Sequence, residues 1–250
     1  MTPNKRLLVL AAAATCVVQA QAGIVFQDSF DTNSAAHWSY SGANTGTWAA
    51  DSQKLQSSLT QTNHNPSTPG FAAINGLTTS SHFKIEADVQ VVGNTPGQGM
   101  DWGHVGFFWG QTGAAYSMGY LRTHLDHVTA WESNYTGEVI TPAAFATTNA
   151  ADINGVSYHL AFEVDYVAQL MRVTLNGTSA VFGGADFDRA NSAGGMGGAL
   201  GVISWGERVS YDNVVVTDFA GNTVPEPGSL ALVVSALGLM GAAARRRRRT

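Results

Sequence analysis

The sequence predicts an all-β protein, a two-sheet antiparallel β-sandwich. Several segments alternate between apolar and polar residues, which is the pattern of strands with one buried face. Clusters of Gly, Asn, Ser and Thr separate these segments. Between Gly23 and Val224, no stretch keeps the 3.6-residue apolar period of a helix for three turns. About a dozen short strands in roughly 200 residues are typical of two packed antiparallel sheets.

The clearest single strand is expected over residues 82–91. Its apolar face carries Phe83, Ile85, Ala87, Val89 and Val91, and its other face is polar. A last strand is expected over residues 209–217, and residues 185–191 are expected to form one helical turn.

A hairpin is expected in the second half of the chain. Residues 158–165 alternate with the same period, and a turn over residues 166–169 leads into a second apolar series at 171–175. The pair Asn176-Gly177 that follows is favoured in tight turns between antiparallel strands.

Composition narrows the classes of partner. Charged residues make up 12% of the chain and hydrophobic residues 44%, which excludes a wholly disordered protein. Between Gly23 and Val224 there are six basic and 17 acidic residues, a net charge of −11. Such a body is a poor partner for nucleic acid or anionic lipid. The single cysteine, Cys16, lies near the N-terminus, so the body has no disulfides.

Residues 1–22 are predicted to be a secretory signal peptide. Two basic residues precede an apolar run over residues 7–18, and small residues follow at the positions that a signal peptidase reads. Cleavage by signal peptidase is expected between Ala22 and Gly23. An uncleaved anchor is the alternative, although the run is short for a membrane span.

Residues 221–250 are predicted to be a membrane-directed tail. Three short elements follow one another: Pro225, Glu226 and Pro227, an uncharged stretch over 228–244, and the arginines Arg245, Arg246, Arg247, Arg248 and Arg249. The stretch would form ~25 Å of transmembrane helix, enough for a thin bilayer. The arginines would stay in the cytoplasm and place the acidic body outside. The alternatives are a plain C-terminal anchor and a tail that is disordered in water.

This order of elements resembles the PEP-CTERM sorting signal of Gram-negative bacteria. The resemblance implies recognition by an exosortase, a membrane cysteine protease-transpeptidase that removes the helix and passes the protein to the cell surface. It also implies a host that makes extracellular polysaccharide. The chain is therefore expected to consist of a signal peptide (1–22), a β-sandwich domain (23–220) and a sorting signal (221–250).

The body resembles concanavalin A-like and laminin-G-like jelly rolls over residues 24 to 219. The resemblance rests on the order of short motifs, among them Asp28-Ser29-Phe30-Asp31, Gly106-Phe107-Phe108-Trp109-Gly110, Leu175-Asn176-Gly177 and Tyr211-Asp212-Asn213. This fold is found in lectins, glycosidases, lyases and adhesion modules, so it does not by itself define a function.

A carbohydrate-binding face is predicted from the outward positions of the strands. If these strands share one sheet, its open face carries aromatic, charged and imidazole side chains: Phe108, Tyr120, Arg122, Trp131, His159, Glu163 and Arg172. Sugar rings stack on aromatic side chains, and their hydroxyls bind carboxylates and guanidinium groups. The alternative is that several of the aromatic residues belong to the core and that a bulge shifts the alternation.

Catalysis is not expected, although two patterns keep it open. Laminarinase-type glycosidases of the same fold place three carboxylates at alternate positions of one strand, and this sequence has Glu86, Asp88 and then Gln90. Glutamine cannot donate the catalytic proton, which argues against retaining hydrolysis. The alternative for the two carboxylates is a solvated strand face. A lyase base stays open, with Tyr120, His127 and His159 as candidates.

No cofactor is expected, with one possible exception. Asp28 near the start and Asp212 near the end would meet if the first and last strands pair, and carboxylates suit a structural Ca²⁺. Alternatively, Asp212 caps a turn with Asn213.

The sequence therefore predicts an exported protein, transiently anchored in the inner membrane, that ends at the cell surface or in the extracellular matrix. There its sandwich is expected to bind polysaccharide or to act structurally, without catalysis. Two alternatives stay open: a carbohydrate-active hydrolase or lyase, and a coat protein that assembles through exposed strand edges.

Overall fold

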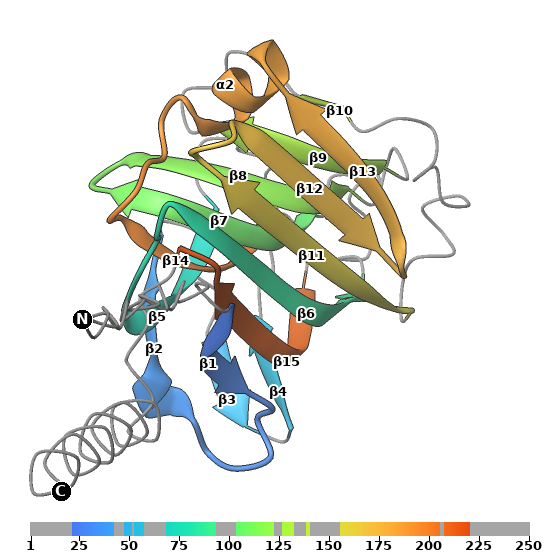
Figure 1. Ribbon diagram of the computed structural model, residues 1–250. Coiled ribbons are helices and arrows are strands. Elements are labelled where there is room, and N and C mark those ends of the chain that lie inside the picture. Colours follow the sequence, from blue (N-terminus) through green and yellow to red (C-terminus); the bar gives the residue numbers. More distant parts are fainter. Residues whose placement is uncertain are drawn as a thin grey trace, which may run out of the picture. The chain divides into compact units, whose positions relative to one another are not determined.

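The computed structural model describes residues 22–42, 48–51, 53–57, 69–93, 104–122, 127–132, 139–140, 156–205 and 208–220. The described strands form two antiparallel sheets, which are packed face to face in Figure 1. The protein is thus an all-β, two-sheet antiparallel sandwich, as predicted. The predicted signal peptide up to residue 21 and the predicted sorting signal from residue 221 onward lie outside the described residues.

Sheet A contains eight of the described strands. In spatial order they are β13 (Thr178–Gly183), β12 (Leu170–Leu175), β11 (Ser157–Asp165), β6 (His82–Gly93), β15 (Arg208–Asp218), β4 (Lys54–Ser57) and β3 (Trp48–Asp51), and β1 (Gly23–Asp28) also pairs with β15. Neighbours β11 and β6 come from segments about 70 residues apart in the chain and pair without a break in register, from Ser157 opposite Gln90 to Asp165 opposite His82.

Sheet B contains seven of the described strands. In spatial order they are β10 (Val139–Ile140), β9 (His127–Glu132), β8 (Ala115–Arg122), β7 (His104–Thr112), β14 (Ala199–Trp205), β5 (Gly70–Thr78) and β2 (Trp38–Ser41). Two short helices complete the described elements, η1 (Ala35–His37) and α2 (Ala185–Asn191). No helix in these ranges is both long enough and apolar enough to cross a membrane.

The main core lies between the two sheets. The side chains that alternate inward from β6 and β11 include Ile85, Val89, Leu160 and Phe162, each fully buried. They meet inward side chains of sheet B, as where the ring of Phe107 contacts that of Phe162 edge to face. Burial of these apolar side chains is the main driving force for the packing of the sheets.

A buried tyrosine also joins the sheets through hydrogen bonds. The hydroxyl of Tyr211 on β15 accepts a hydrogen bond from the backbone N–H of Gly106 at 2.8 Å. It also lies within hydrogen-bonding distance of the carbonyl oxygens of Gly106 and Ile203 in sheet B. A polar group buried this deeply needs such partners, because it has lost its water.

The strand predictions with a clear period are confirmed. The segments expected at 82–91, 158–165 and 209–217 are the central strands of sheet A, and their apolar faces point into the core. The turn at Asn176-Gly177 has positive φ angles of 47° and 83°, as this hairpin turn requires. The helical turn expected over residues 185–191 is α2.

Candidate functional site

The outer face of sheet A, which points away from the core, carries a network of charged side chains. Because side chains alternate along a strand, the residues between the core positions of β6 and β11 all point outward. Those that form ion-pair contacts with one another are His82, Lys84, Glu86 and Asp88 on β6 and His159, Glu163 and Asp165 on β11. With Arg172 of β12, they form two groups of four, which we call quartets.

The His159 quartet consists of Lys84, Glu86, Asp88 and His159. Atom Nδ1 of His159 lies 3.0 Å from Oδ1 of Asp88, and Nε2 lies 3.4 Å from Oε2 of Glu86. The second oxygen of Glu86 is 2.8 Å from Nζ of Lys84. The second oxygen of Asp88 accepts a hydrogen bond from the side-chain amide of Asn213 at 2.9 Å. Each carboxylate therefore has one histidine contact and one contact from another residue.

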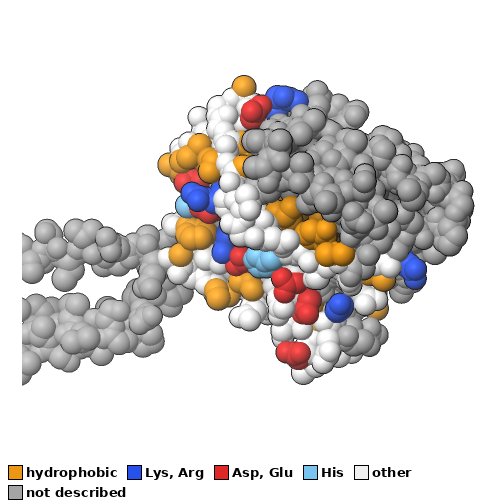
Figure 2. Space-filling view, turned by 90° about the vertical axis from the view of Figure 1, so that its right-hand side faces the viewer, with side chains coloured by type: hydrophobic (Ala, Val, Ile, Leu, Met, Phe, Trp, Pro, Cys, Tyr) orange, Lys and Arg blue, Asp and Glu red, His pale blue; other side chains and the backbone are white. Residues whose placement is uncertain are grey.

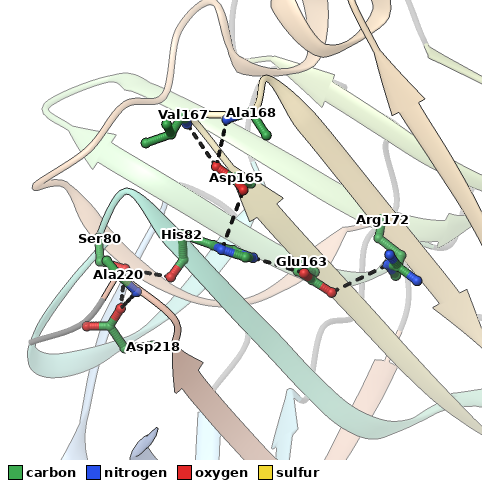
Figure 3. Close-up of polar contacts among 9 residues, drawn as sticks. All are labelled: Ser80, His82, Glu163, Asp165, Val167, Ala168, Arg172, Asp218 and Ala220. Carbon is green, nitrogen blue, oxygen red and sulfur yellow. Dashed lines mark hydrogen bonds and ion pairs between the residues drawn. The ribbon is translucent and has the colours of Figure 1, made fainter. Parts of the chain in front are cut away.

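The His82 quartet consists of His82, Glu163, Asp165 and Arg172, and Figure 3 shows it at the starting end of β6. Atom Nε2 of His82 lies 2.9 Å from Oε1 of Glu163, and Nδ1 lies 3.5 Å from Oδ2 of Asp165. Arg172 approaches the other oxygen of Glu163 with Nε at 3.5 Å. The other oxygen of Asp165 accepts hydrogen bonds from the backbone of the turn that follows β11.

The two quartets have reciprocal geometry across one pair of strands. In one, a histidine of β11 lies between two carboxylates of β6; in the other, a histidine of β6 lies between two carboxylates of β11. This follows from the register, in which His159 is opposite Asp88 and His82 is opposite Asp165. The side chains are partly exposed, from 19% for Glu86 to 55% for Arg172. They are therefore accessible to a ligand in solution.

The electrostatic balance of this face depends on the histidines. Each quartet has two carboxylates and one permanent cation, so it carries one negative charge when its histidine is neutral and none when the histidine is protonated. Asp212 on β15 lies directly opposite Asp88 and adds another carboxylate. Figure 2 shows acidic side chains gathered near a histidine on the side of the molecule turned to the viewer, with lysine and arginine more scattered.

Apolar side chains border the charged network at the β12–β13 edge. Val181 of β13 is directly opposite Arg172 and is 54% exposed, and Leu170 is 43% exposed. At the other end, the ring of Phe219 stacks on His82 with centroids 4.5 Å apart. Apolar surface beside hydrogen-bonding groups is what a sugar ring can use, since its C–H face and its hydroxyls bind different partners.

Three of the seven predicted sugar-binding residues come together here. His159, Glu163 and Arg172 all lie on the outer face of sheet A, as their alternation predicted. His82, Lys84 and Asp165 are further members that were not predicted from the sequence. The signal for them is the polar face of the 82–91 and 158–165 strands, but it becomes a site only through the pairing of these two strands.

The prediction that all seven residues share one open sheet face is wrong. Phe108, Tyr120, Arg122 and Trp131 lie on β7, β8 and β9, which belong to sheet B, whereas the other three lie on sheet A. Phe108 and Tyr120 do point away from the main core, but neither is exposed, with 0% relative accessibility each. The side chains of Arg122 and Trp131 are outside the described part of the structure, as is that of the candidate base His127.

The buried aromatic residues of sheet B form a second core. Its members lie on the face of sheet B opposite the main core: Phe71, Phe108, Tyr116, Met118, Tyr120 and Ile203. The ring of Phe71 packs edge to face against Phe108 and Tyr116, with centroids 5.0 and 4.9 Å apart. Packing, rather than display to solvent, therefore accounts for these aromatic residues, although Phe108 and Tyr120 keep the outward direction that their alternation predicts. Burial also raises the pKa of Tyr116 to about 12.

The predicted carboxylates lie where the sequence placed them. Glu86 and Asp88 point outward together, and Gln90 accepts a hydrogen bond from the hydroxyl of Ser210 on β15 at 3.4 Å. Gln90, at the position of the third carboxylate, thus forms a hydrogen bond with the neighbouring strand. An imidazole beside a carboxylate, as in His159 and Asp88, is a group able to accept or donate a proton.

The proposed calcium ligands, Asp28 and Asp212, are not opposite each other in the pairing of the first and last strands. The first and last strands do pair, with Asp28 opposite Val214, but Val214 points into the core and Asp212 points outward with Asp88. The carboxylate of Asp28 is buried and accepts hydrogen bonds from Phe30 N–H and Trp38 Nε1–H, both at 2.9 Å.

Asp212 instead accepts a hydrogen bond from the backbone N–H of Asn213 at 2.8 Å, in a bulge where Asn213 has φ of 52°. The turn-capping alternative therefore describes this residue. Within the described residues, no group of three or more His, Cys, Asp or Glu side chains is arranged to hold a metal ion.

Comparison with known structures identifies the fold as a jelly roll of the galectin, concanavalin A-like lectin and glucanase type. A Bacillus subtilis protein of unknown function with a galectin-like fold aligns with a TM-score of 0.54 at 11% identity, over 77% of this chain and 94% of that chain. Basic winged bean lectin aligns with a TM-score of 0.52 at 10% identity, over 79% and 98%. Bacillus licheniformis β-glucanase aligns with a TM-score of 0.50 at 14% identity, over 78% and 98%. Because identity is so low, these alignments establish the fold alone.

The match of the C-terminal segment is more specific than these structural alignments. Residues 223–249 match the PEP-CTERM protein-sorting motif. The chain is therefore a jelly-roll protein with a PEP-CTERM sorting motif, which indicates export by sorting to the cell surface. No protein with a curated function matches the sequence significantly.

Proposed function

We propose that this protein is processed by an exosortase and acts at the cell surface or in the extracellular matrix as a non-catalytic polysaccharide-binding protein. The binding surface is the outer face of sheet A, around the two quartets. The arrangement of carboxylates, imidazoles and one guanidinium on adjacent strands is the observation that carries this proposal.

The chemistry of this face suits polysaccharide hydroxyls. A hydroxyl donates one hydrogen bond and accepts others, so it pairs well with a surface that offers both carboxylates and cationic donors. Arg172 is the most exposed donor of the network, and Val181 directly opposite supplies apolar surface for the C–H face of a sugar ring. A sheet face gives such groups a regular spacing along which an extended polymer can bind.

Sorting and binding support one another in this proposal. Signal peptidase acts on the N-terminal segment and exosortase on the PEP-CTERM motif at residues 223–249. The membrane helix is then transient, and the body is released into the polysaccharide that surrounds the cell. Its net negative charge between Gly23 and Val224 keeps it from binding nucleic acid.

A glycan array with the full-length chain in mild detergent tests the binding. The array should include exopolysaccharide from the host culture and neutral β-glucan oligosaccharides. We expect retention of at least one polysaccharide and loss of retention in the Arg172→Gln variant. The matched control is Arg189→Gln, since Arg189 is an exposed arginine of α2 that pairs with Asp186. Retention of no glycan would refute the binding role.

A carbohydrate-active hydrolase or lyase is the second candidate, favoured by the contact of His159 with Asp88 and Glu86. In such an enzyme, His159 would transfer the proton and the carboxylates would orient it. Incubation of the retained glycan with the protein, followed by size analysis, distinguishes the two functions. Shortening of the glycan by the unaltered protein but not by the His159→Gln variant would favour the enzyme. Glycan chains of unchanged length would favour binding alone.

A further inference from the structure

We propose that the outer face of sheet A is gated by pH, with its two histidines withholding the carboxylates from a ligand in acid and releasing them near neutral pH. This inference rests on the proposed polysaccharide binding and adds its regulation. It is carried by the reciprocal placement of His82 and His159, each with both ring nitrogens directed at carboxylates.

The number of N–H groups on an imidazole determines how many carboxylates it can donate hydrogen bonds to. A protonated imidazole has two N–H donors and can serve both carboxylates of its quartet. A neutral imidazole has one donor, and its other nitrogen then presents a lone pair to a carboxylate oxygen. One carboxylate of each quartet therefore loses its histidine partner when the proton leaves. Histidine is the side chain whose ordinary charge change falls between about pH 5 and 8.

In the His159 quartet, both carboxylates keep a second contact when the histidine is neutral. Glu86 is held by Lys84 and Asp88 by Asn213, so neither side chain swings away from the face. The freed oxygen stays in place and can accept a hydrogen bond from a sugar hydroxyl. Asp212, opposite Asp88 on β15, places a second negative charge nearby. This charge favours the binding of a hydrogen-bond donor at Asp88.

In the His82 quartet, both carboxylates likewise keep a second contact when the histidine is neutral. Glu163 keeps Arg172, and Asp165 keeps the backbone N–H groups of Val167 and Ala168, as Figure 3 shows. The ring of Phe219, from the chain after β15, stacks on His82. Lys84 lies opposite Glu163 in the register.

Deprotonation of the histidines changes the charge of the outer face as well as its hydrogen bonds. Deprotonation of both histidines lowers the charge of the face by two units, because both quartets change from neutral to singly negative. A neutral glycan is affected only through the freed acceptors, whereas a charged glycan would also feel the altered field. Uncharged oligosaccharides therefore isolate the hydrogen-bonding part of the gate.

The test measures binding of cellohexaose, laminarihexaose and host exopolysaccharide to the full-length chain at pH 5 and pH 8. For the retained glycan, we expect affinity about three- to tenfold higher at pH 8, the size expected for two partly exposed pairs. The variant His82→Gln/His159→Gln keeps amide donors but does not titrate, and its affinity should be the same at both pH values. The control His37→Gln removes an exposed histidine of η1 and should keep the pH response.

The outcomes separate the gate from the binding role. Equal affinity of the unaltered protein at pH 5 and pH 8 would overturn the gate and leave polysaccharide binding standing. An unchanged pH response in the double variant would also overturn it. Binding of no glycan at either pH would overturn both proposals. Side-chain NMR of the two histidine rings provides a readout without glycan: the proposal requires two N–H signals per ring at pH 5 and one at pH 8.

Discussion

His159 of β11 and Asp88 of β6 are direct cross-strand partners whose side chains meet, with Nδ1 3.0 Å from Oδ1. The two residues are 71 positions apart in the chain. In this contact the imidazole lies on β11 and the carboxylate lies on the partner strand, β6. At His82 the roles of the two strands are reversed. The face is thus defined by strand pairing rather than by any one segment.

Replacement of Asp88 by Asn should weaken glycan binding while leaving the fold intact. The amide keeps the shape of the carboxylate but loses its charge, so it is a poorer acceptor for a sugar hydroxyl. Stability should change by less than about 1 kcal/mol, because the side chains of His159 and Asp88 are 45% and 37% exposed and solvent screens the pair. Urea unfolding and glycan affinity check the two parts.

The control for this change is Asp186→Asn. Asp186 lies on α2, has an exposed side chain and pairs with Arg189, so its loss changes the net charge equally. An equal fall in affinity in both variants would mean that overall charge, rather than the Asp88 site, controls binding.

Gly119 should tolerate no side chain, because the two sheets approach closely there. A Cβ built on Gly119 lies 2.1 Å from the ring of Phe162, which is fully buried and cannot move aside freely. Gly119→Ala should therefore destabilise the protein by about 1–3 kcal/mol through overpacking. Gly195→Ala is the matched control, since its Cβ meets nothing within 4 Å. Equal urea midpoints for the two variants would contradict the close packing.

The alternation of apolar residues predicted the faces of single strands well. In residues 82–91 and 158–165, the residues expected to point inward, such as Ile85 and Phe162, are buried in the core. This succeeded because the side-chain period of a strand is two, whatever strand lies beside it. The outward direction of His159 and Arg172 was predictable for the same reason.

Sheet membership could not be obtained in this way. Period-two alternation does not say which strands are neighbours, and the β6–β11 pairing joins segments about 70 residues apart. Nor does alternation say whether an outward face is covered. Phe108 and Tyr120 point outward from the main core, yet both are buried in a second cluster of sheet B. Apolar aromatic residues at outward positions are themselves a signal for such a covered face.

Alkaline pH should unfold the protein as its tyrosines ionise. Burial raises the pKa of Tyr116 to about 12, and burial raises those of Tyr166 and Tyr211 further. Since tyrosine in the unfolded chain loses its proton near pH 10, the unfolded state binds fewer protons above that value, and stability falls as the pH rises. Far-UV circular dichroism should be lost above about pH 10, together with the appearance of tyrosinate absorbance from the buried groups. Complete ionisation of all tyrosines near pH 10 with the strands intact would contradict this.

Replacement of Pro225, Glu226 and Pro227 by alanine should stop sorting without affecting the sandwich, because these residues lie in the sorting motif, beyond the last described strand. An epitope inserted after Gly113, in the exposed turn between β7 and β8, reports the location of the body. In an exosortase-positive host, the unaltered chain should appear outside the cell, shortened at both ends. The alanine variant should stay in the inner membrane with its C-terminal segment attached. A variant with lysine in place of the arginines at 245–249 keeps the charge and tests whether the guanidinium groups are needed. Full-length unaltered protein persisting in the inner membrane of that host would contradict exosortase processing.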